Sequence, residues 1–232
     1  MNKKTIITSS LAGVALLITS TVSLADATPS NSLRAGVYFI QYSVKADDLS
    51  GPLTPPGLNA KLENTTTAYF AYVRRLDPHF QIELAFGLPP KTKTRAVGPA
   101  ALGSVPFDGQ EILTAKWISP SILLEYVFFD ESAPLRPYIG IGVNHTSFVE
   151  RRITDAGQAI VGGASTVSLS SSTGIAGTIG VSYHVKDAWH VYGSYSMAQI
   201  QSDVNVNTLG INRVTHINFG PRTVVLSVGY SF

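Results

Sequence analysis

The chain has 232 residues, with 17 Lys and Arg, 15 Asp and Glu, and no cysteine. The lack of cysteine excludes a disulfide framework, a metal site built on thiolates and the lipid-modified cysteine of a lipoprotein. Once Lys3 and Lys4 are set aside with the N-terminal leader, 15 basic and 15 acidic residues remain. The basic pI of the whole chain therefore does not indicate nucleic-acid binding, which requires a clustered positive face.

The N-terminus has the features of a secretory signal peptide. A mostly apolar stretch at 6–18 follows two lysines, and a small-x-small cleavage pattern ends at Ala25. No later stretch reaches the roughly 18 apolar residues that a membrane-spanning helix needs. If the mature chain enters a membrane, only a closed barrel can pair all its backbone groups. We therefore predict a signal peptide at 1–25 and a single domain at 26–232.

The mature chain is predicted to form eight strands. Alternating runs rich in β-branched and aromatic residues occur near 33–45, 64–75, 80–88, 111–128, 137–148, 173–185, 189–201 and 223–232. Their connections alternate between short ones with turn residues, at 76–79, 130–136 and 186–188, and long ones, at about 46–63, 89–110, 149–172 and 202–222. The long ones are rich in Gly, Pro, Ser, Thr and Asn, and no helix is expected in them. This alternation is typical of a transmembrane β-barrel.

The final strand has a two-residue period. Its even positions from 224 onward are apolar and end in Tyr230 and Phe232, while the odd positions are small or polar apart from Val225. All apolar side chains therefore share one face, which suits a wall between lipid and a lumen. The last strand of a soluble sandwich is the alternative. In the first two strands both faces carry aromatics, so their register stays open by one residue.

Aromatic residues gather near the short turns and the C-terminus. Rings at one level of a membrane form an interfacial girdle, although an aromatic core is the alternative for any one of them. The residues concerned are Phe80, Phe128, Phe129, Tyr138, Tyr183, Trp189, Tyr230 and Phe232.

Charged residues are predicted on the inward faces of two strands. Glu83 and Glu125 alternate with apolar neighbours, and Lys116 is expected to face inward nearby. Buried charges must be paired or hydrogen-bonded. We therefore expect Arg or Lys side chains from neighbouring strands to bridge to them and to plug the lumen, and an ion-selective ring is the alternative.

Four segments resemble the OmpW-type outer-membrane proteins. The resemblance follows the whole mature chain in order and loop spacing, and its most specific part is the run from Arg136 to Asn144. The segments are Leu33-Arg34-Ala35-Gly36, Ile82-Glu83-Leu84 followed by Pro89, Arg136-Pro137-Tyr138-Ile139-Gly140-Ile141-Gly142-Val143-Asn144, and Ser227-Val228-Gly229-Tyr230-Ser231-Phe232.

The resemblance implies an all-β fold: an eight-stranded antiparallel transmembrane β-barrel of the OmpW/AlkL kind, with short periplasmic turns and long extracellular loops. It implies export to the outer membrane of a Gram-negative bacterium, where Tyr230 and Phe232 would serve as the C-terminal signal for the barrel-assembly machinery. Outer-membrane lipid and small hydrophobic solutes are the other partners that it implies. No cofactor and no metal are expected.

The function implied by the resemblance is uptake of small hydrophobic molecules. An eight-stranded barrel is nearly filled by its own side chains, so an apolar solute would enter between the extracellular loops and leave sideways into lipid. Exposed apolar loop residues are costly unless they cover one another or bind something, and we assign Leu53, Leu58, Leu102 and Phe107 to the entrance. Mutual packing of the loops is the alternative.

The lumen is assigned to Glu83, Ala85, Glu125 and Ser196. Relatives are expected to narrow at bulky apolar side chains, whereas Ala85 and Ser196 are small. The constriction is therefore expected elsewhere, or the lumen is wider.

Two other functions stay open at this point. A barrel without transport activity could display its loops as an adhesion surface or a receptor. A barrel enzyme would need catalytic residues near the outer rim, where His145 and Asp155 are the best candidates. Because no Gly-x-Ser-x-Gly or His-Glu-x-x-His motif accompanies them, no catalytic residue is predicted.

Overall fold

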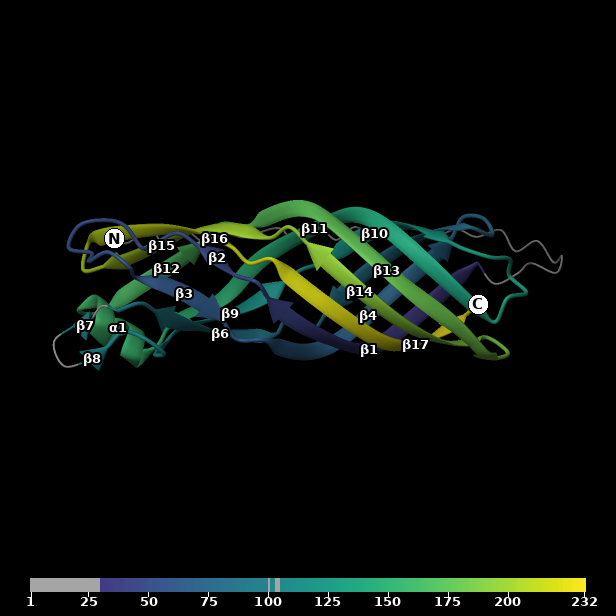
Figure 1. Cartoon of the computed structure of the whole chain (residues 1–232), viewed down its shortest axis with the longest axis horizontal. Coiled ribbons are helices and arrows are strands. Elements are labelled where there is room, and N and C mark those ends of the chain that lie inside the picture. The colour runs from purple at the N-terminus through teal and green to yellow at the C-terminus, as the bar shows by residue number, and fades with distance from the viewer. Residues whose placement is uncertain (1–29, 100, 103–104) are drawn as a thin grey trace, which may run out of the picture.

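The centre of the molecule is a closed barrel of eight antiparallel strands (Figure 1). The computed structural model describes residues 30–99, 101–102 and 105–232, so the predicted signal peptide lies outside the described residues. Pairing between β10 and β11 closes the barrel, and the predicted fold class is confirmed. In order around the barrel the strands are β10 (Ser121–Val127), β5 (Phe80–Gly87), β4 (Thr65–Arg75), β1 (Asn31–Tyr42), β17 (Pro221–Ser231), β14 (Trp189–Ala198), β13 (Ser172–Lys186) and β11 (Leu135–Ile153).

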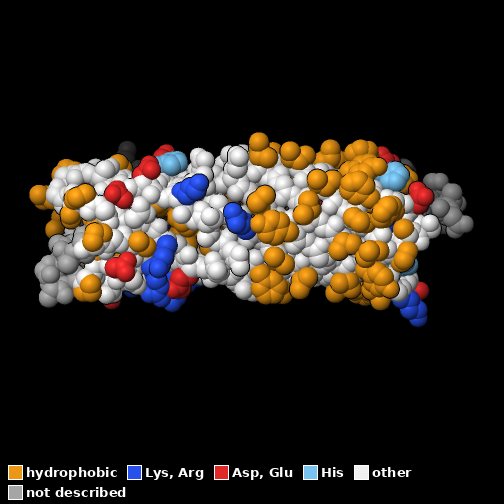
Figure 2. Space-filling model, in the orientation of Figure 1, with side chains coloured by type: hydrophobic (Ala, Val, Ile, Leu, Met, Phe, Trp, Pro, Cys, Tyr) orange, Lys and Arg blue, Asp and Glu red, His pale blue; other side chains and the backbone are white. Residues whose placement is uncertain are grey.

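Side chains along each barrel strand alternate between the outside and the lumen. In β5, Ile82 and Leu84 are exposed whereas Glu83 and Ala85 are buried, and the same alternation runs through β10, β13 and β17. The outward apolar side chains cover the barrel half of the molecule in Figure 2. The two-residue period therefore predicted the faces of these strands correctly.

Seven of the predicted girdle aromatics are exposed on the outside at the end of the barrel that carries the short turns, here called the turn end. The prediction is wrong for Tyr138, which is only 4% exposed. Its neighbours Ile139 and Ile141 face outward, and side chains alternate along a strand, so Tyr138 points into the lumen.

Beyond the barrel, at the loop end, the long connections continue as paired strands. The predicted strand at 111–128 is two strands, β9 and β10, separated by Ser119 and Pro120. A proline has no N–H to donate to a neighbouring strand. The long strand β11 pairs with β9 (Glu111–Ile118), β9 with β6 (Lys91–Val97), and β6 with β3 (Asn59–Leu62).

A second sheet completes this extension. Its order is β12 (Ser165–Leu169), β15 (Gln201–Thr208), β16 (Ile211–Asn218) and β2 (Lys45–Ala46). A separate two-stranded sheet pairs β7 (Ala101–Leu102) with β8 (Val105–Pro106).

The expectation that the long connections hold no helix is also wrong, because α1 (Asp155–Val161) lies in one of them. Its N-cap is Thr154, whose hydroxyl accepts a hydrogen bond from the Gly157 amide at 3.0 Å. Its C-cap is Gly162, at a φ of 88° that glycine adopts without strain. The helix buries Ile160 in the extension. The described residues contain no helix that is long and apolar enough to cross a membrane.

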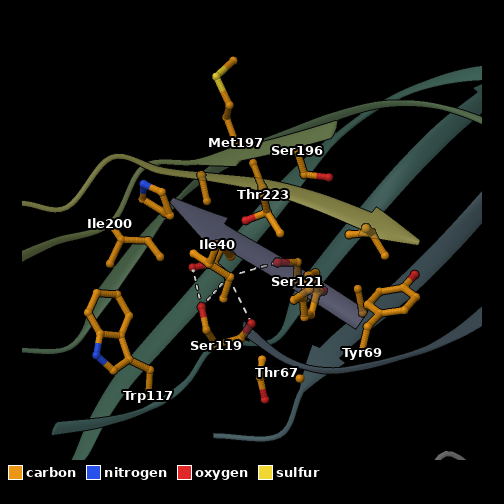
Figure 3. A pocket seen from close by; sticks show the side chains of 18 of the residues that line it. Ile40, Thr67, Tyr69, Trp117, Ser119, Ser121, Ser196, Met197, Ile200 and Thr223 are labelled. Carbon is orange, nitrogen blue, oxygen red and sulfur yellow. Dashed lines mark hydrogen bonds between the residues drawn. The ribbon is translucent and has the colours of Figure 1, made fainter. Parts of the chain in front are cut away.

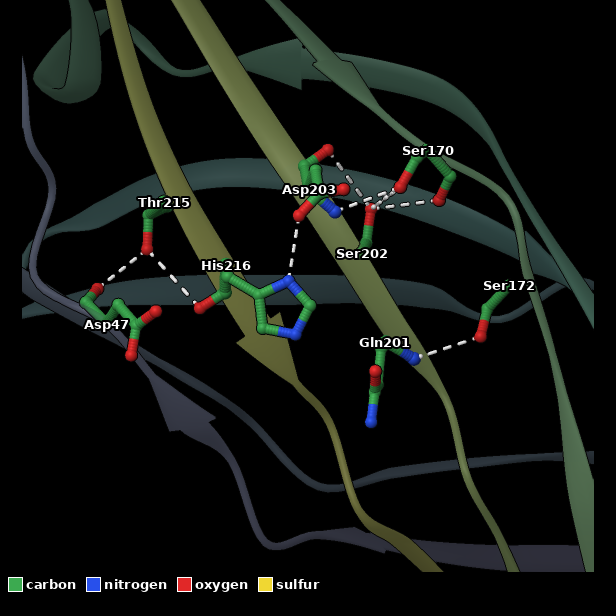
Figure 4. A network of polar contacts seen from close by, with 8 residues as sticks. All are labelled: Asp47, Ser170, Ser172, Gln201, Ser202, Asp203, Thr215 and His216. Atoms are coloured by element: carbon green, nitrogen blue, oxygen red, sulfur yellow. Dashed lines mark hydrogen bonds and ion pairs between the residues drawn. The ribbon is translucent and has the colours of Figure 1, made fainter.

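The β15–β16 hairpin is held by its turn and by polar contacts along its strands (Figure 4). Leu209 and Gly210 have φ values of 51° and 89°, as a two-residue hairpin turn requires. His216 Nδ1 lies 2.8 Å from Asp203 Oδ1, and the Thr215 hydroxyl donates to the Asp47 carbonyl of the β2 segment at 2.6 Å. These contacts fix the hairpin so that its inner face turns toward the interior of the extension.

Candidate functional site

An apolar cavity of about 100 Å³ lies inside the extension. Its wall joins parts of the chain that are distant in sequence: α1, β9, the β15–β16 hairpin and the connections around β2, β3 and β8. The side chains that face it are mostly aliphatic or aromatic, and they include Leu49, Leu58, Phe107, Ile160, Val206 and Ile217. We call it the outer cavity. A cavity of this composition accommodates apolar solutes.

The residues assigned to the entrance occupy different positions. Leu58 and Phe107 are 7% and 6% exposed, pack with Ala96 and Ile160, and line the outer cavity. They are therefore not exposed at loop tips. Leu53 is 82% exposed and is not among the residues that line the cavity. Leu102 is in β7, and its side chain lies outside the described residues.

A cluster of aromatic rings separates the outer cavity from the barrel. Trp117 lies with its ring centroid 4.8 Å from those of both Phe148 and Phe219, edge to face, and Tyr42 is 5.2 Å from Trp117 on the barrel side. The Trp117 indole N–H donates to Thr92 Oγ1 at 2.7 Å, which fixes the ring. We call Trp117, Phe148 and Phe219 the aromatic partition.

A second cavity, of about 110 Å³, lies in the barrel directly below the partition. Figure 3 shows Trp117 and Ile200 at one end of it and Tyr69 at the other. Ala85 and Ser196, both assigned to the lumen, line this mid-barrel cavity, and the Ser196 hydroxyl donates to Thr178 Oγ1 at 2.9 Å. Their small side chains leave this level open, and the bulky rings of the aromatic partition lie above it.

The barrel wall is interrupted beside the mid-barrel cavity. Pairing between β5 and β10 ends at Ala85 and Ser121, and pairing between β6 and β9 starts at Lys91 and Lys116. The facing stretches, 86–90 and 117–120, are not paired with each other. They contain three prolines that cannot donate a hydrogen bond across the wall, namely Pro89, Pro90 and Pro120. We call this interruption the wall gap.

Side chains on both edges of the wall gap explain why it stays open. Asn144 of β11, buried in the barrel, donates from Nδ2 to the Pro120 carbonyl at 3.1 Å and to Ser119 Oγ at 3.0 Å. This edge is therefore held toward β11 and away from β5. On the other edge, Leu88 is exposed on the outside and also lines the mid-barrel cavity. The cavity thus lies directly beside the wall gap.

A charged cluster fills the lumen between the mid-barrel cavity and the turn end. Arg34 Nη1 lies 2.5 Å from Glu83 Oε2, and the Tyr69 hydroxyl donates to Glu83 Oε1 at 3.0 Å. Gln81 Nε2 donates to Glu125 Oε2 at 2.5 Å, while the second oxygen of the fully buried Glu125 has no partner among the described residues. The expected bridge from an arginine is confirmed for Glu83, although Arg34 belongs to β1, which is separated from β5 by β4. The prediction is wrong for Glu125, whose partner among the described residues is Gln81 and not an Arg or Lys. We call Arg34, Glu83 and Glu125 the charged plug.

The prediction that Lys116 faces inward is wrong. Lys116 is an even number of positions from Ile118 and Ile122, which are both exposed on the outside, so it shares their face. Its Nζ lies 2.7 Å from Glu150 Oε2 on the outer surface.

A third chamber, of about 290 Å³, opens at the turn end. Its polar lining includes Arg75, Arg136, His184 and His190, and Arg75 Nη1 lies 2.7 Å from Glu131 Oε1. Arg34 also lines this chamber, so the charged plug forms the boundary between it and the mid-barrel cavity. The lumen is therefore closed below the mid-barrel cavity.

The residues considered for catalysis do not come together. His145 Nδ1 lies 2.8 Å from Thr173 Oγ1 and its Nε2 lies 3.3 Å from Ser147 Oγ, and no carboxylate of the described residues bonds to it. Asp155 begins α1 instead. Within the described part of the chain, no group of three or more His, Asp or Glu could hold a metal ion.

Sequence reasoning missed the aromatic partition and the role of Asn144. Trp117 is an even number of positions from Glu125, and Phe148 is an even number of positions from Asn144. Glu125 and Asn144 face inward, and such positions share a face of a strand. The two-residue period therefore predicts that both rings lie in the interior. Phe219 lies between β16 and β17, where no periodicity applies.

Comparison with known proteins identifies the same architecture. The family model described as "OmpW family" matches residues 34–232. Outer membrane protein W of Salmonella typhi is 28% identical over 171 residues, which cover 74% of this chain and 75% of that protein. The crystal structure of the outer membrane protein OprG from Pseudomonas aeruginosa superposes with a TM-score of 0.77 at 18% identity, covering 88% of this chain and 96% of that one. The solid-state NMR structure of AlkL in lipid bilayers gives a TM-score of 0.63 at 18% identity, covering 92% and 95%.

Proposed function

This chain belongs to the OmpW family, and we propose that it is a conduit through which small hydrophobic molecules enter from outside the cell and leave sideways into the outer membrane. The chain is an outer-membrane barrel of a Gram-negative bacterium. The loop end is accordingly extracellular and the turn end periplasmic, as in other barrels of this kind.

The observation that supports the proposal best is the order of the cavities. The apolar outer cavity comes first, the aromatic partition second, and the mid-barrel cavity third, with the wall gap at its side and the charged plug below it. An apolar solute gains nothing from the charged plug, because its passage would separate buried charges from their partners. Through the wall gap the solute would instead enter the hydrocarbon region of the membrane directly.

The aromatic partition is the step at which the solute is selected. Val204 and Ile217 of the same apolar cluster line the outer cavity, and Trp117 and Ile200 line the mid-barrel cavity. A solute therefore passes from the outer cavity to the mid-barrel cavity only when the rings of the aromatic partition move apart. In this proposal Leu53 makes the first contact at the surface, and Leu58 and Phe107 form the wall of the outer cavity. No catalytic step and no cofactor are involved.

Two segments near the ends of the chain would carry the signals for export and assembly. The segment at 1–25 would direct export and be removed, leaving 26–232 as the barrel domain. Tyr230 and Phe232, exposed at the periplasmic end of β17, would present the C-terminal signal to the barrel-assembly machinery.

Closing the wall gap is expected to slow the release of solute. Replacing Pro89, Pro90 and Pro120 with Ala restores three N–H donors, so that strand pairing can extend from Ala85 toward Lys91. We expect apolar tracer uptake by proteoliposomes to fall about tenfold, while backbone amides at 86–90 and 117–120 gain protection from hydrogen exchange.

The control is Pro137→Ala, because Pro137 lies in the paired part of β11. It should leave tracer uptake unchanged. Protected amides at the gap together with undiminished uptake would show that solute leaves by another route.

A further inference from the structure

Lys and Arg side chains gather between the apolar surface of the barrel and the loop end, as Figure 2 shows for one face of the molecule. On the outward face of the sheet formed by β3, β6, β9 and β11 they are especially dense. The residues of this basic face are Lys61, Lys91, Lys93, Arg95, Lys116 and Arg152.

The acidic residues on this sheet neutralise only part of the charge. Lys93 Nζ lies 3.0 Å from Glu111 Oε2, Lys116 pairs with Glu150, and Arg95 with Glu63. Among the described residues, Lys61, Lys91 and Arg152 have no ion-pair partner. The mature chain has balanced charge overall, so this excess is local.

The strand register places like charges directly opposite one another. Lys91 is the cross-strand partner of Lys116, and Lys61 is the partner of Arg95. Like charges in such positions destabilise a sheet. The arrangement becomes favourable when an anion lies between the strands on the outer surface.

The basic face lies at the level of the lipid headgroups. Leu88 and Ile118 are exposed at the extracellular edge of the apolar surface, and Lys91 and Lys116 lie two or three residues beyond them. At about 3.3 Å per residue this places the ammonium groups within roughly 10 Å of the hydrocarbon, in the interfacial layer of a bilayer. The outward residues of other strands at this level are mainly uncharged, among them Gln41, Thr66, Thr173 and Gln199, and the exposed Arg222 opposite Gln41 is a single cation.

We propose that the basic face centred on Lys91 and Lys116 binds the phosphate groups of a phosphorylated glycolipid in the outer leaflet. Charge complementarity and continuity with the lipid-facing surface favour this occupant, since the outer leaflet of such a membrane presents phosphomonoesters at this depth. Lys91 directly follows Pro90 at the wall gap, so the acyl chains of the bound glycolipid lie against the gap. The binding itself does not depend on the proposed transport function.

The test measures lipid binding to the refolded barrel by native mass spectrometry. The probes are diphosphorylated lipid A and the same lipid with both phosphates removed, and phosphatidylglycerol serves as a competitor. We expect the phosphorylated lipid to bind on the order of tenfold more weakly to Lys91→Gln/Lys116→Gln than to the wild type. Lys45→Gln/Lys186→Gln removes the same charge from two other exposed positions and should bind like the wild type.

Lys91→Arg/Lys116→Arg keeps the charge and should keep the affinity, which separates a loss of binding from a loss of folding in the Gln variant. Equal binding of the two lipid A forms to the wild-type barrel would overturn the proposal. So would equal binding of lipid A to the two charge-removing variants, or competition by phosphatidylglycerol at equal concentration, which would leave only general attraction of anions.

Discussion

Replacing Val206 with Asn is expected to slow the uptake of a small apolar tracer by about tenfold or more. Val206 lines the outer cavity from the β15–β16 hairpin. An amide at this position holds water, which an entering apolar solute must remove without offering a hydrogen bond in return. Such a loss costs about 1–3 kcal/mol, which corresponds to roughly fivefold to 150-fold weaker occupancy. The measurement is the initial rate of tracer uptake by proteoliposomes.

The matched control for this variant is Val214→Asn. Val214 lies on the neighbouring strand of the same hairpin but is exposed on its outer surface. The two variants therefore make the same chemical change on opposite faces of one hairpin. Equal uptake rates for both variants would contradict a route through the outer cavity.

Replacing Arg34 with Met is expected to lower the free energy of unfolding of the barrel by about 3–5 kcal/mol, the usual cost of removing one partner of a buried ion pair. Glu83 would lose its partner at 2.5 Å, and the neighbouring Glu125, which has an unpaired oxygen already, would lose the nearby positive charge. Urea unfolding of the refolded barrel in lipid vesicles, followed by tryptophan fluorescence, measures the change.

Two further variants show whether this effect comes from the buried charge. Arg34→Met/Glu83→Met removes both partners and should recover part of the lost stability, because no uncompensated charge is left at that pair. Arg74→Met removes an exposed arginine of β4 and should change the free energy of unfolding by less than about 1 kcal/mol. If Arg34→Met were as mild as Arg74→Met, the charged plug would not stabilise the barrel.

The barrel could be predicted from the sequence because its strands face two different environments. Ile82, Leu84, Val228 and Tyr230 alternate with small or polar residues, and this period is visible without knowledge of strand partners. The same period also corrects two errors. The exposed Ile139 beside Tyr138 places Tyr138 on the inward face, and the exposed Ile118 two residues from Lys116 places Lys116 on the outward face.

The pairing in the charged plug, the extension and the aromatic partition could not be predicted, because they depend on contacts between distant parts of the chain. Arg34 meets Glu83 across the lumen because β1 and β5 both pair with β4 in particular registers, and no local pattern specifies those registers. Apart from β9, the strands of the extension are not predictable from the sequence, because they are short and rich in Thr, Ser and Asn. Their apolar residues gain burial only from one another. The aromatic partition brings β9 and β11 together with Phe219, a contact that no short segment specifies.

The most direct test of the conduit is the uptake of a small apolar tracer by liposomes that contain the refolded barrel, compared with empty liposomes. The structure predicts faster uptake of the apolar tracer and no faster uptake of a charged tracer of similar size, because the charged plug closes the lumen below the wall gap. A folded barrel that does not accelerate the apolar tracer, or that accelerates both tracers equally, would contradict lateral transport of hydrophobic solutes.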